Sequence, residues 1–309
     1  PFALVEAMII ASFATGCEQG FIYLRGEYPR AIRNVQNAID ESKKHGFLGK
    51  NILDSGFNFE LTIVRGAGAY ICGEETAIFN SIEGYRGEPR NKPPFPVEVG
   101  VFGKPTLVNN VETLVNVLSI VNDGGAAYAA LGTEGSKGRK LFCLSGAVTK
   151  PGIYEVEFGI TLRQLIDLAG GLRSGSTLQA ILLGGAAGGF VGPDDLDLPL
   201  TMEATRAAGS SLGSGVVMVL DQSVDMVDQL RRIAAFFRDE SCGQCVPCRV
   251  GTVRQEEIIS RLAQGVQSQD IEMLRELGTV MRDASICGLG QTANSAIDSA
   301  INKLKVFAQ

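Results

Sequence analysis

Three cysteines, Cys242, Cys245 and Cys248, stand close together near one end of the 309-residue chain. A C-x2-C-x2-C run can direct three sulfur atoms toward one point when the chain turns tightly. Zinc sites usually take cysteines in separated pairs, whereas a triple run with this spacing is typical of iron–sulfur ligation. Cys287, in a glycine-containing loop farther along, is the natural candidate for a fourth ligand. We therefore predict a four-cysteine iron–sulfur centre, with a structural zinc site as the alternative.

Charge and histidine content exclude other kinds of function. The chain has 28 Lys and Arg against 34 Asp and Glu, a net charge of −6, which argues against nucleic acid as the main partner. His45 is the only histidine, so Ser–His–Asp hydrolases and multi-histidine zinc sites are improbable.

The ends and apolar runs of the sequence bear on its location. The longest apolar run, at residues 181–190, is interrupted by glycines and is too short to cross a bilayer. We expect no direct membrane insertion, and a cytoplasmic protein that is either free or peripheral on the cytoplasmic face of a membrane complex. Because the chain opens on Pro1 rather than Met, we also expect the natural N-terminus to lie upstream.

Helical and strand-like patterns alternate over the first 122 residues. The predicted elements are a helix at 2–13, a strand at 21–25, a helix at 29–45, a strand at 59–64 and helices at 74–82 and 110–122. A strand, a helix and a strand in this order imply a parallel unit within an α/β layer. A proline-rich loop at 88–96 separates the last two helices.

The remaining chain predicts two further domains. Beyond a Gly- and Ala-rich boundary at 123–138, strands at 140–145, 153–156, 180–183 and 216–220 with a single helix at 161–169 fit a β-grasp-like domain. Its glycines at 184–189 are better explained as turns than as a nucleotide loop. From residue 224 the chain is helical, at 224–238, 252–264, 269–281 and 292–307, which predicts a four-helix bundle.

Two polar segments of the first domain are candidates for ligand binding. Gly66 and Gly68, followed by Tyr70, join a strand to a helix and would let the backbone approach a flat or phosphorylated ligand. A tight turn explains the same glycines. Asn109 and Asn110 stand at a helix start, where they could hold a phosphate or merely cap the helix.

Two long segments resemble one known family. GAGAYICGEETAIFNS at 66–81 and ESCGQCVPCRVG at 240–251 closely resemble the flavoprotein subunit of respiratory complex I and its soluble relatives, the diaphorase subunits of NAD-linked hydrogenases and formate dehydrogenases. The likeness covers nearly the whole chain. Phe79 departs from it where an aliphatic residue is usual. The flavin loop that members carry ahead of residue 1 here has no counterpart.

The resemblance implies a fold and cofactors. The class is α/β: a flavin- and NADH-binding layer truncated at its N-terminus at 1–137, a β-grasp (ubiquitin-like, soluble-ligand-binding) domain at 138–223, and a helical bundle carrying a [4Fe–4S] cluster at 224–309. Gly66 and Gly68 would lie under FMN, Gly73, Glu74 and Glu75 beside it, and Asn109, Asn110 and Thr113 at its phosphate. Tyr70 and Glu75 would lie near NAD(H), with Phe95 stacked on its adenine. The cluster ligands would be Cys242, Cys245, Cys248 and Cys287.

The implied activity is that of an NADH dehydrogenase (diaphorase) subunit. It moves a hydride between NAD(H) and FMN, then single electrons to the cluster and on to partner subunits. The implied partners are a thioredoxin-like [2Fe–2S] subunit and a larger iron–sulfur or catalytic subunit of a hydrogenase, formate dehydrogenase or complex I type. Residues 285–293 resemble the soluble relatives more than complex I. A flavin-free iron–sulfur electron relay and a zinc-stapled scaffold remain as alternatives.

Overall fold

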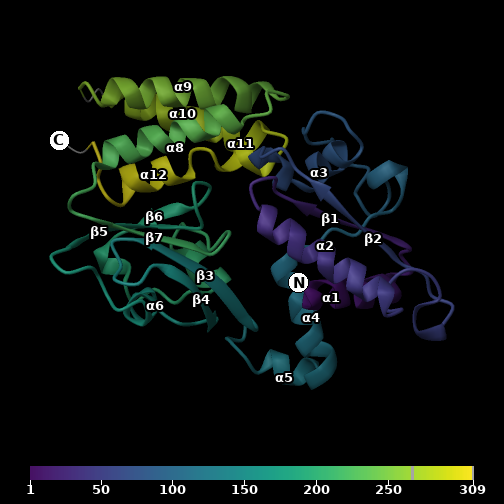
Figure 1. The fold of residues 1–309 in the computed structure, drawn as a ribbon. Coiled ribbons are helices and arrows are strands. Elements are labelled where there is room, and N and C mark those ends of the chain that lie inside the picture. Colours follow the sequence, from purple (N-terminus) through teal and green to yellow (C-terminus); the bar gives the residue numbers. More distant parts are fainter. Residues whose placement is uncertain (266–267, 308–309) are drawn as a thin grey trace. The chain divides into compact units, whose positions relative to one another are not determined.

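The computed structural model describes residues 1–265 and 268–307 and has a mixed α/β fold (Figure 1). The chain forms two compact units, Pro1–Tyr128 and Ala129–Gln309, which are described separately. None of the helices in these described ranges has the length and apolar composition that a membrane span requires.

The first unit is built on a parallel pair of strands. β1 (Gln19–Leu24) and β2 (Glu60–Arg65) run in parallel and are connected through α2 (Pro29–Lys44). The predicted strand–helix–strand unit is therefore confirmed. Its apolar core joins one face of α2 to both strands and α1, and is formed by Leu4, Val5, Ile22, Val35, Ala38, Ile39, Leu48, Ile52, Phe59 and Leu61.

The other helices of this unit also follow the sequence pattern. They are α1 (Phe2–Thr15), α3 (Glu75–Ile82) and α4 (Val111–Asp123), with the short α5 (Gly125–Ala129) following. α5 lies in the stretch at 123–138 that we expected to be a domain boundary, where no helix was predicted. Its three alanines favour a helix intrinsically, which explains the difference.

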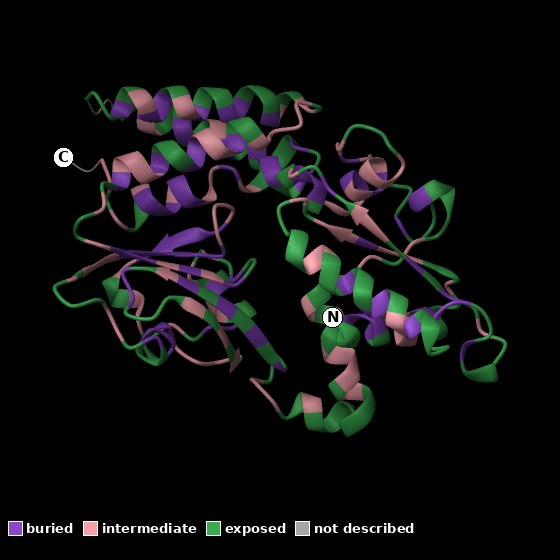
Figure 2. Ribbon diagram, in the orientation of Figure 1, coloured by how far each residue is buried: buried purple, intermediate pink, exposed green. Residues whose placement is uncertain are grey.

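The second unit begins with a five-stranded mixed sheet, in the order β4–β3–β7–β5–β6. The strands are β3 (Arg139–Gly146), β4 (Gly152–Glu157), β5 (Leu178–Leu183), β6 (Gly189–Val191) and β7 (Val216–Asp221). β3 and β7 are parallel, and the other pairs are antiparallel. Buried and exposed residues alternate along β3, so one of its faces covers the core (Figure 2).

Two elements of this sheet region were not predicted. α6 (Leu162–Leu168) is the expected helix, with Thr161 and Gln164 forming a capping box. The expectation of a single helix is nevertheless wrong, because α7 (Met202–Ala207) follows, and β6 was also missed. Both elements are too short to display a period. The glycines between β5 and β6 form a turn, with Gly184 and Gly185 at positive φ, as predicted.

Among its described residues, the second unit is completed by five helices. They are α8 (Met226–Glu240), α9 (Val246–Leu262), α10 (Ser268–Ala284), α11 (Gly288–Thr292) and α12 (Ser295–Asn302). α9 begins six residues before the predicted start, because Pro247 lies in its first turn, where proline is tolerated. The helix expected at 292–307 corresponds to the shorter α12, and α11, which precedes it, was not predicted. Phe190 N–H donates to Ser299 Oγ at 2.8 Å, which joins β6 to α12.

Gly146 and Gly171 offer a test of how tightly β3 and β7 pack. Both have positive φ, at 84° and 75°, so alanine at either position incurs a backbone cost of about 1–2 kcal/mol. A Cβ at Gly146 would also lie 2.0 Å from the Val219 carbonyl oxygen, whereas one at Gly171 meets nothing within 4 Å. In urea unfolding, we expect Gly146→Ala to lose about 3 kcal/mol or more and Gly171→Ala about 1 kcal/mol. Equal losses would contradict this account.

Candidate functional site

The turn after β2 requires its glycines for steric reasons. Gly66 N–H donates to the Leu24 carbonyl at 2.7 Å, and a Cβ at Gly66 would lie 2.8 Å from Tyr23 Oη. Gly68 has a φ of 93°, in the left-handed region that glycine favours. The tight-turn interpretation thus accounts for both glycines, and a ligand is not needed to explain them.

The two adjacent glutamates at the start of α3 have different surroundings. Glu74 is the N-cap of α3, and its carboxylate accepts from Thr76 N–H and Ala77 N–H, both at 2.8 Å. Lys92 Nζ donates to Glu74 at 3.0 Å and also to Glu75. Lys92 therefore ties the proline-rich loop to both carboxylates, a role that we did not predict because a single lysine beside prolines has no periodic signal.

Charge in this cluster is set by hydrogen bonding rather than by burial. Burial alone would raise the pKa of Glu74, but hydrogen bonds from Thr76 and Ala77 and the Lys92 ammonium outweigh it and hold the pKa below 4.5. Burial opposes the charge on Lys92, yet Glu75 and Glu74 raise its pKa above the usual value. Glu74 and Lys92 are both charged at neutral pH.

Several of the predicted binding residues are exposed. Tyr70 begins a short 3-10 turn (Tyr70–Gly73), and its ring is 41% exposed. Phe95 is 52% exposed, and its N–H donates to the Glu98 carboxylate at 2.9 Å. A Cβ built on Gly73 meets nothing within 4 Å. Two accessible aromatic rings and an open backbone position are suited to a planar ligand.

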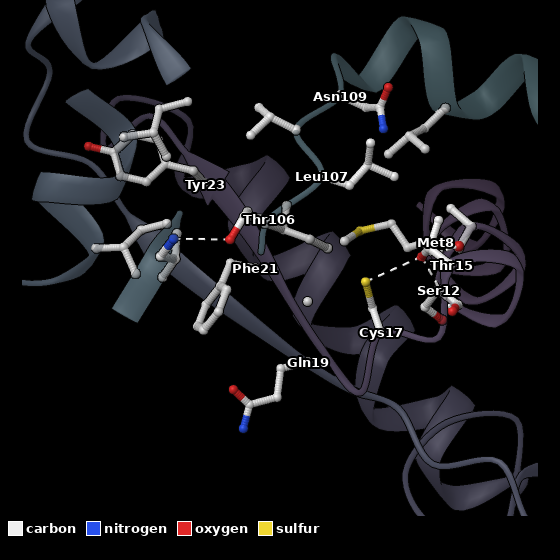
Figure 3. A pocket seen from close by; sticks show the side chains of 18 of the residues that line it. Met8, Ser12, Thr15, Cys17, Gln19, Phe21, Tyr23, Thr106, Leu107 and Asn109 are labelled. Atoms are coloured by element: carbon white, nitrogen blue, oxygen red, sulfur yellow. Dashed lines mark hydrogen bonds between the residues drawn. The ribbon is translucent and has the colours of Figure 1, made fainter. Parts of the chain in front are cut away.

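A cavity of about 550 Å³ lies within the first unit (Figure 3). It is enclosed by α1, β1, α3, residues 104–109 and the start of α4, and its lining is mainly apolar. Among the predicted binding residues, Asn109 is the one that lines it. Tyr23, which packs against Gly66, lines it too. The cavity therefore borders both predicted polar segments. Asn109 belongs to one of them, and Tyr23 packs against Gly66 of the other.

The adjacent residues Asn109 and Asn110 also make different contacts. Asn110 is the N-cap of α4, and its side chain accepts from Glu112 N–H at 2.8 Å. Capping therefore explains Asn110, whereas Asn109 does not cap α4 and lines the cavity. Thr113 lies in the first turn of α4 and is exposed. Backbone N–H groups at this helix start are available to an anion.

The structure gathers the four predicted metal ligands in the second unit. Burial raises the pKa of the Cys248 thiol to about 11, the Ser241 hydroxyl opposes this rise, and the charges of Cys245, Cys287 and Cys242 add to it. A Cβ built on Gly290, three residues after Cys287, would lie 2.9 Å from Cys248 Cβ, so the segment of Cys287 packs against the start of α9. Cys248 and Cys287 are buried, and the other two are partly exposed.

Their local structure differs from a simple turn. Cys245 is the N-cap of α9, and Cys248 lies in the first turn of that helix rather than in a coil. Cys287 is the N-cap of α11. In the part of the chain that the structure describes, no three His, Cys, Asp or Glu side chains are arranged to hold one metal ion.

Three segments of the chain match known families. Residues 1–119 match the Nuo51 FMN-binding domain, residues 141–195 the SLBB domain, and residues 228–306 the NADH-ubiquinone oxidoreductase-F iron-sulfur binding region. The first match contains the glycine turn, the glutamates and the asparagines. The last contains all four cysteines.

Relatives that match along nearly the whole chain agree with these assignments. The chain is 42% identical over 304 residues to the HndC subunit of the NADP-reducing hydrogenase of Solidesulfovibrio fructosivorans, covering 98% of this chain and 62% of that one. It is 44% identical over 306 residues to the F subunit of NADH-quinone oxidoreductase from Mycobacterium tuberculosis, covering 99% and 69%.

A solved structure is also similar. An NAD+-reducing [NiFe]-hydrogenase in the H2-reduced state superposes with a TM-score of 0.89 at 38% sequence identity. The match covers 100% of this chain and 52% of that one. The chain therefore spans about half to two-thirds of the length of these proteins.

The lowered pKa of Glu74 predicts a pH-dependent contribution to stability. The contribution is fully present above the unfolded pKa, near 4.5, and is lost as the pH falls through the lower folded pKa. Glu74→Gln should cost about 1 kcal/mol at neutral pH, and the difference from wild type should shrink as the pH falls through the lowered folded pKa. Urea unfolding at neutral and at acidic pH checks it. A pH-independent difference for Glu74→Gln would contradict the prediction.

Proposed function

Because the chain belongs to the family that contains the F subunit of NADH-quinone oxidoreductase and its hydrogenase relatives, we propose that it is the NADH dehydrogenase (diaphorase) subunit of such an assembly. It exchanges a hydride between NAD(H) and FMN and passes single electrons through a [4Fe–4S] cluster to partner subunits. The observation that carries the proposal is that all four cysteines lie inside the region that matches the family's iron–sulfur domain, where Cys248 packs against Gly290, three residues after Cys287.

The cysteine set fits a multi-iron cluster. Four thiols without a histidine or carboxylate are a donor set that iron–sulfur clusters share with some zinc sites. The match of residues 228–306 to the family's iron–sulfur binding region supports Cys242, Cys245, Cys248 and Cys287 as ligands of a cluster.

In the first unit, the chain's own residues would hold and orient FMN and the nucleotide. The flavin would lie along the turn of Gly66, Gly68 and Gly73, where no side chain blocks the backbone at Gly73. Asn109, with Asn110 and Thr113 at the start of α4, would bind the phosphate. Phe95 would stack on the adenine of the nucleotide and Tyr70 would lie near the nucleotide, since both residues are exposed.

The glutamate pair would divide its tasks. Glu74 caps α3 and so fixes the turn beside the flavin, whereas Glu75 would contact the nucleotide. Lys92 holds both carboxylates and would orient Glu75 for this contact. When bound, FMN accepts the hydride and releases electrons singly. Hydride transfer needs no acid or base from the protein, so a chain with one histidine is sufficient.

The domain division and the partners belong to the same proposal. We assign residues 1–137 to FMN and NAD(H), 138–223 to a β-grasp domain and 224–309 to a four-helix bundle with the cluster. The subunit would pass electrons to a thioredoxin-like [2Fe–2S] subunit and a larger iron–sulfur or catalytic subunit. Relatives of both the hydrogenase type and the NADH-quinone oxidoreductase type support a multisubunit redox assembly, and we place the subunit in the cytoplasm as part of this proposal.

Cys287→Ala tests the proposed cluster. We expect the purified variant, reconstituted anaerobically, to lose most of its iron and acid-labile sulfide, because three thiolates leave one iron without a protein ligand. Cys143→Ala is the matched control, since Cys143 is an exposed residue of β3 and should leave the cluster intact. Full iron and sulfide content in Cys287→Ala would refute this ligand, and wild-type protein with zinc instead of sulfide would refute the proposed function.

Asn109→Ala and Asn110→Ala separate flavin binding from helix capping. Asn109→Ala should weaken FMN binding by about tenfold or more through loss of a hydrogen bond to the phosphate, with unfolding unchanged. Asn110→Ala should also lower stability by about 1 kcal/mol because it removes the cap of α4. Flavin fluorescence titration and urea unfolding measure the two effects. Unaltered FMN affinity in Asn109→Ala would contradict its assignment.

A further inference from the structure

Ser285 carries a buried hydroxyl that has no hydrogen-bond partner among the residues that the structure describes. It directly follows α10, is only 7% exposed, and its backbone N–H donates to the Met281 carbonyl at 3.1 Å. Within the described residues, its Oγ makes no hydrogen bond. Buried hydroxyls nearly always have a partner, so this one requires an explanation.

Two other buried side-chain atoms in the described part of the chain also make no hydrogen bond. They are the side-chain carbonyl oxygens of Gln255 and Asn294. An amide oxygen only accepts hydrogen bonds, whereas a hydroxyl also donates. Of these three atoms, only Ser285 Oγ can donate a hydrogen bond.

The hydroxyl faces the cysteine site. A Cβ built on Gly290 would lie 2.4 Å from Ser285 Oγ and 2.9 Å from Cys248 Cβ, so both side chains meet at this glycine. Cys287 follows Ser285 by two residues. The unpartnered donor is therefore next to two of the proposed ligands, which come from two different segments.

A second hydroxyl near the cysteine site, that of Ser241, already contacts a cysteine sulfur. Ser241 Oγ lies 3.2 Å from Cys248 Sγ and accepts from Gly243 N–H at 3.3 Å. Its own hydrogen is thus available to the Cys248 sulfur. A contact of this kind, from hydroxyl to sulfur, is what would satisfy Ser285.

We propose that Ser285 Oγ donates a hydrogen bond to a sulfur atom of the cluster held by Cys248 and Cys287, and thereby raises its reduction potential. The inference rests on the proposed function, because it requires the cluster. One-electron reduction adds negative charge to the cluster, and a donor to sulfur stabilises the reduced form more than the oxidised one. The bond would make the cluster a better acceptor of electrons from the flavin.

Potentiometric titration of the cluster, followed by electron paramagnetic resonance, tests the proposal in the complete protein. At the wild-type midpoint potential, Ser285→Ala should lower the ratio of reduced to oxidised cluster about five- to tenfold, where tenfold corresponds to about 59 mV for one electron. Ser285→Thr keeps the hydroxyl and should restore the ratio toward that of wild type.

Ser299→Ala is the matched control. Ser299 is a buried serine of the same unit, but its hydroxyl donates to the Ala296 carbonyl and accepts from Phe190 N–H, both at 2.8 Å. This variant should lower stability and leave the potential unchanged. An unchanged potential in Ser285→Ala, or failure of that variant to assemble a cluster, would overturn the role of Ser285. Absence of a cluster in wild-type protein would instead overturn the proposed function.

Discussion

The cysteine site depends on the close approach of α9 to α10 and to the loop that contains Cys287. Two glycines make this approach possible. A Cβ at Gly251 would lie 2.5 Å from Met281 Sδ, and one at Gly290 would lie 2.9 Å from Cys248 Cβ. Gln255 Nε2 adds a buried hydrogen bond to the Ala293 carbonyl at 3.0 Å. Segments far apart in the sequence are therefore held together by contacts that leave no room for larger side chains.

Local spacing singled out Cys242, Cys245 and Cys248, because the spacing of three cysteines is a property of the sequence itself; their role as ligands stays a prediction. The return of Cys287 to the triple also followed from the expected connection between helices. The start of α9 at Val246 was not predicted. Pro247 is equally compatible with a loop turn and with the first turn of a helix. The break between α11 and α12 was missed as well. It depends on tertiary contacts around Ala293 and Asn294 that no periodicity records.

In the first unit, the sequence identified the polar segments but not the different contacts that neighbouring residues within each segment make. The helix starts at Glu75 and Val111 followed from apolar spacing and capping residues. Neighbours such as Glu74 and Glu75 look equivalent in a sequence, and their difference appears only through their partners. Lys92 lies 18 residues from Glu74, and its link to both carboxylates depends on the path of the proline-rich loop. Long-range polar contacts of this kind have no local signature.

The position of Cys245 at the N-cap of α9 has a consequence for how the protein matures. Serine, threonine, aspartate or asparagine usually occupies this place and accepts from the first turn, whereas the Cys245 side chain makes no such hydrogen bond. If its thiolate binds iron, the metal anchors the start of the helix in place of a cap. Loading the cluster and completing the first turn of α9 would then be a single event, and apoprotein should exchange the amide protons of this turn faster than holoprotein.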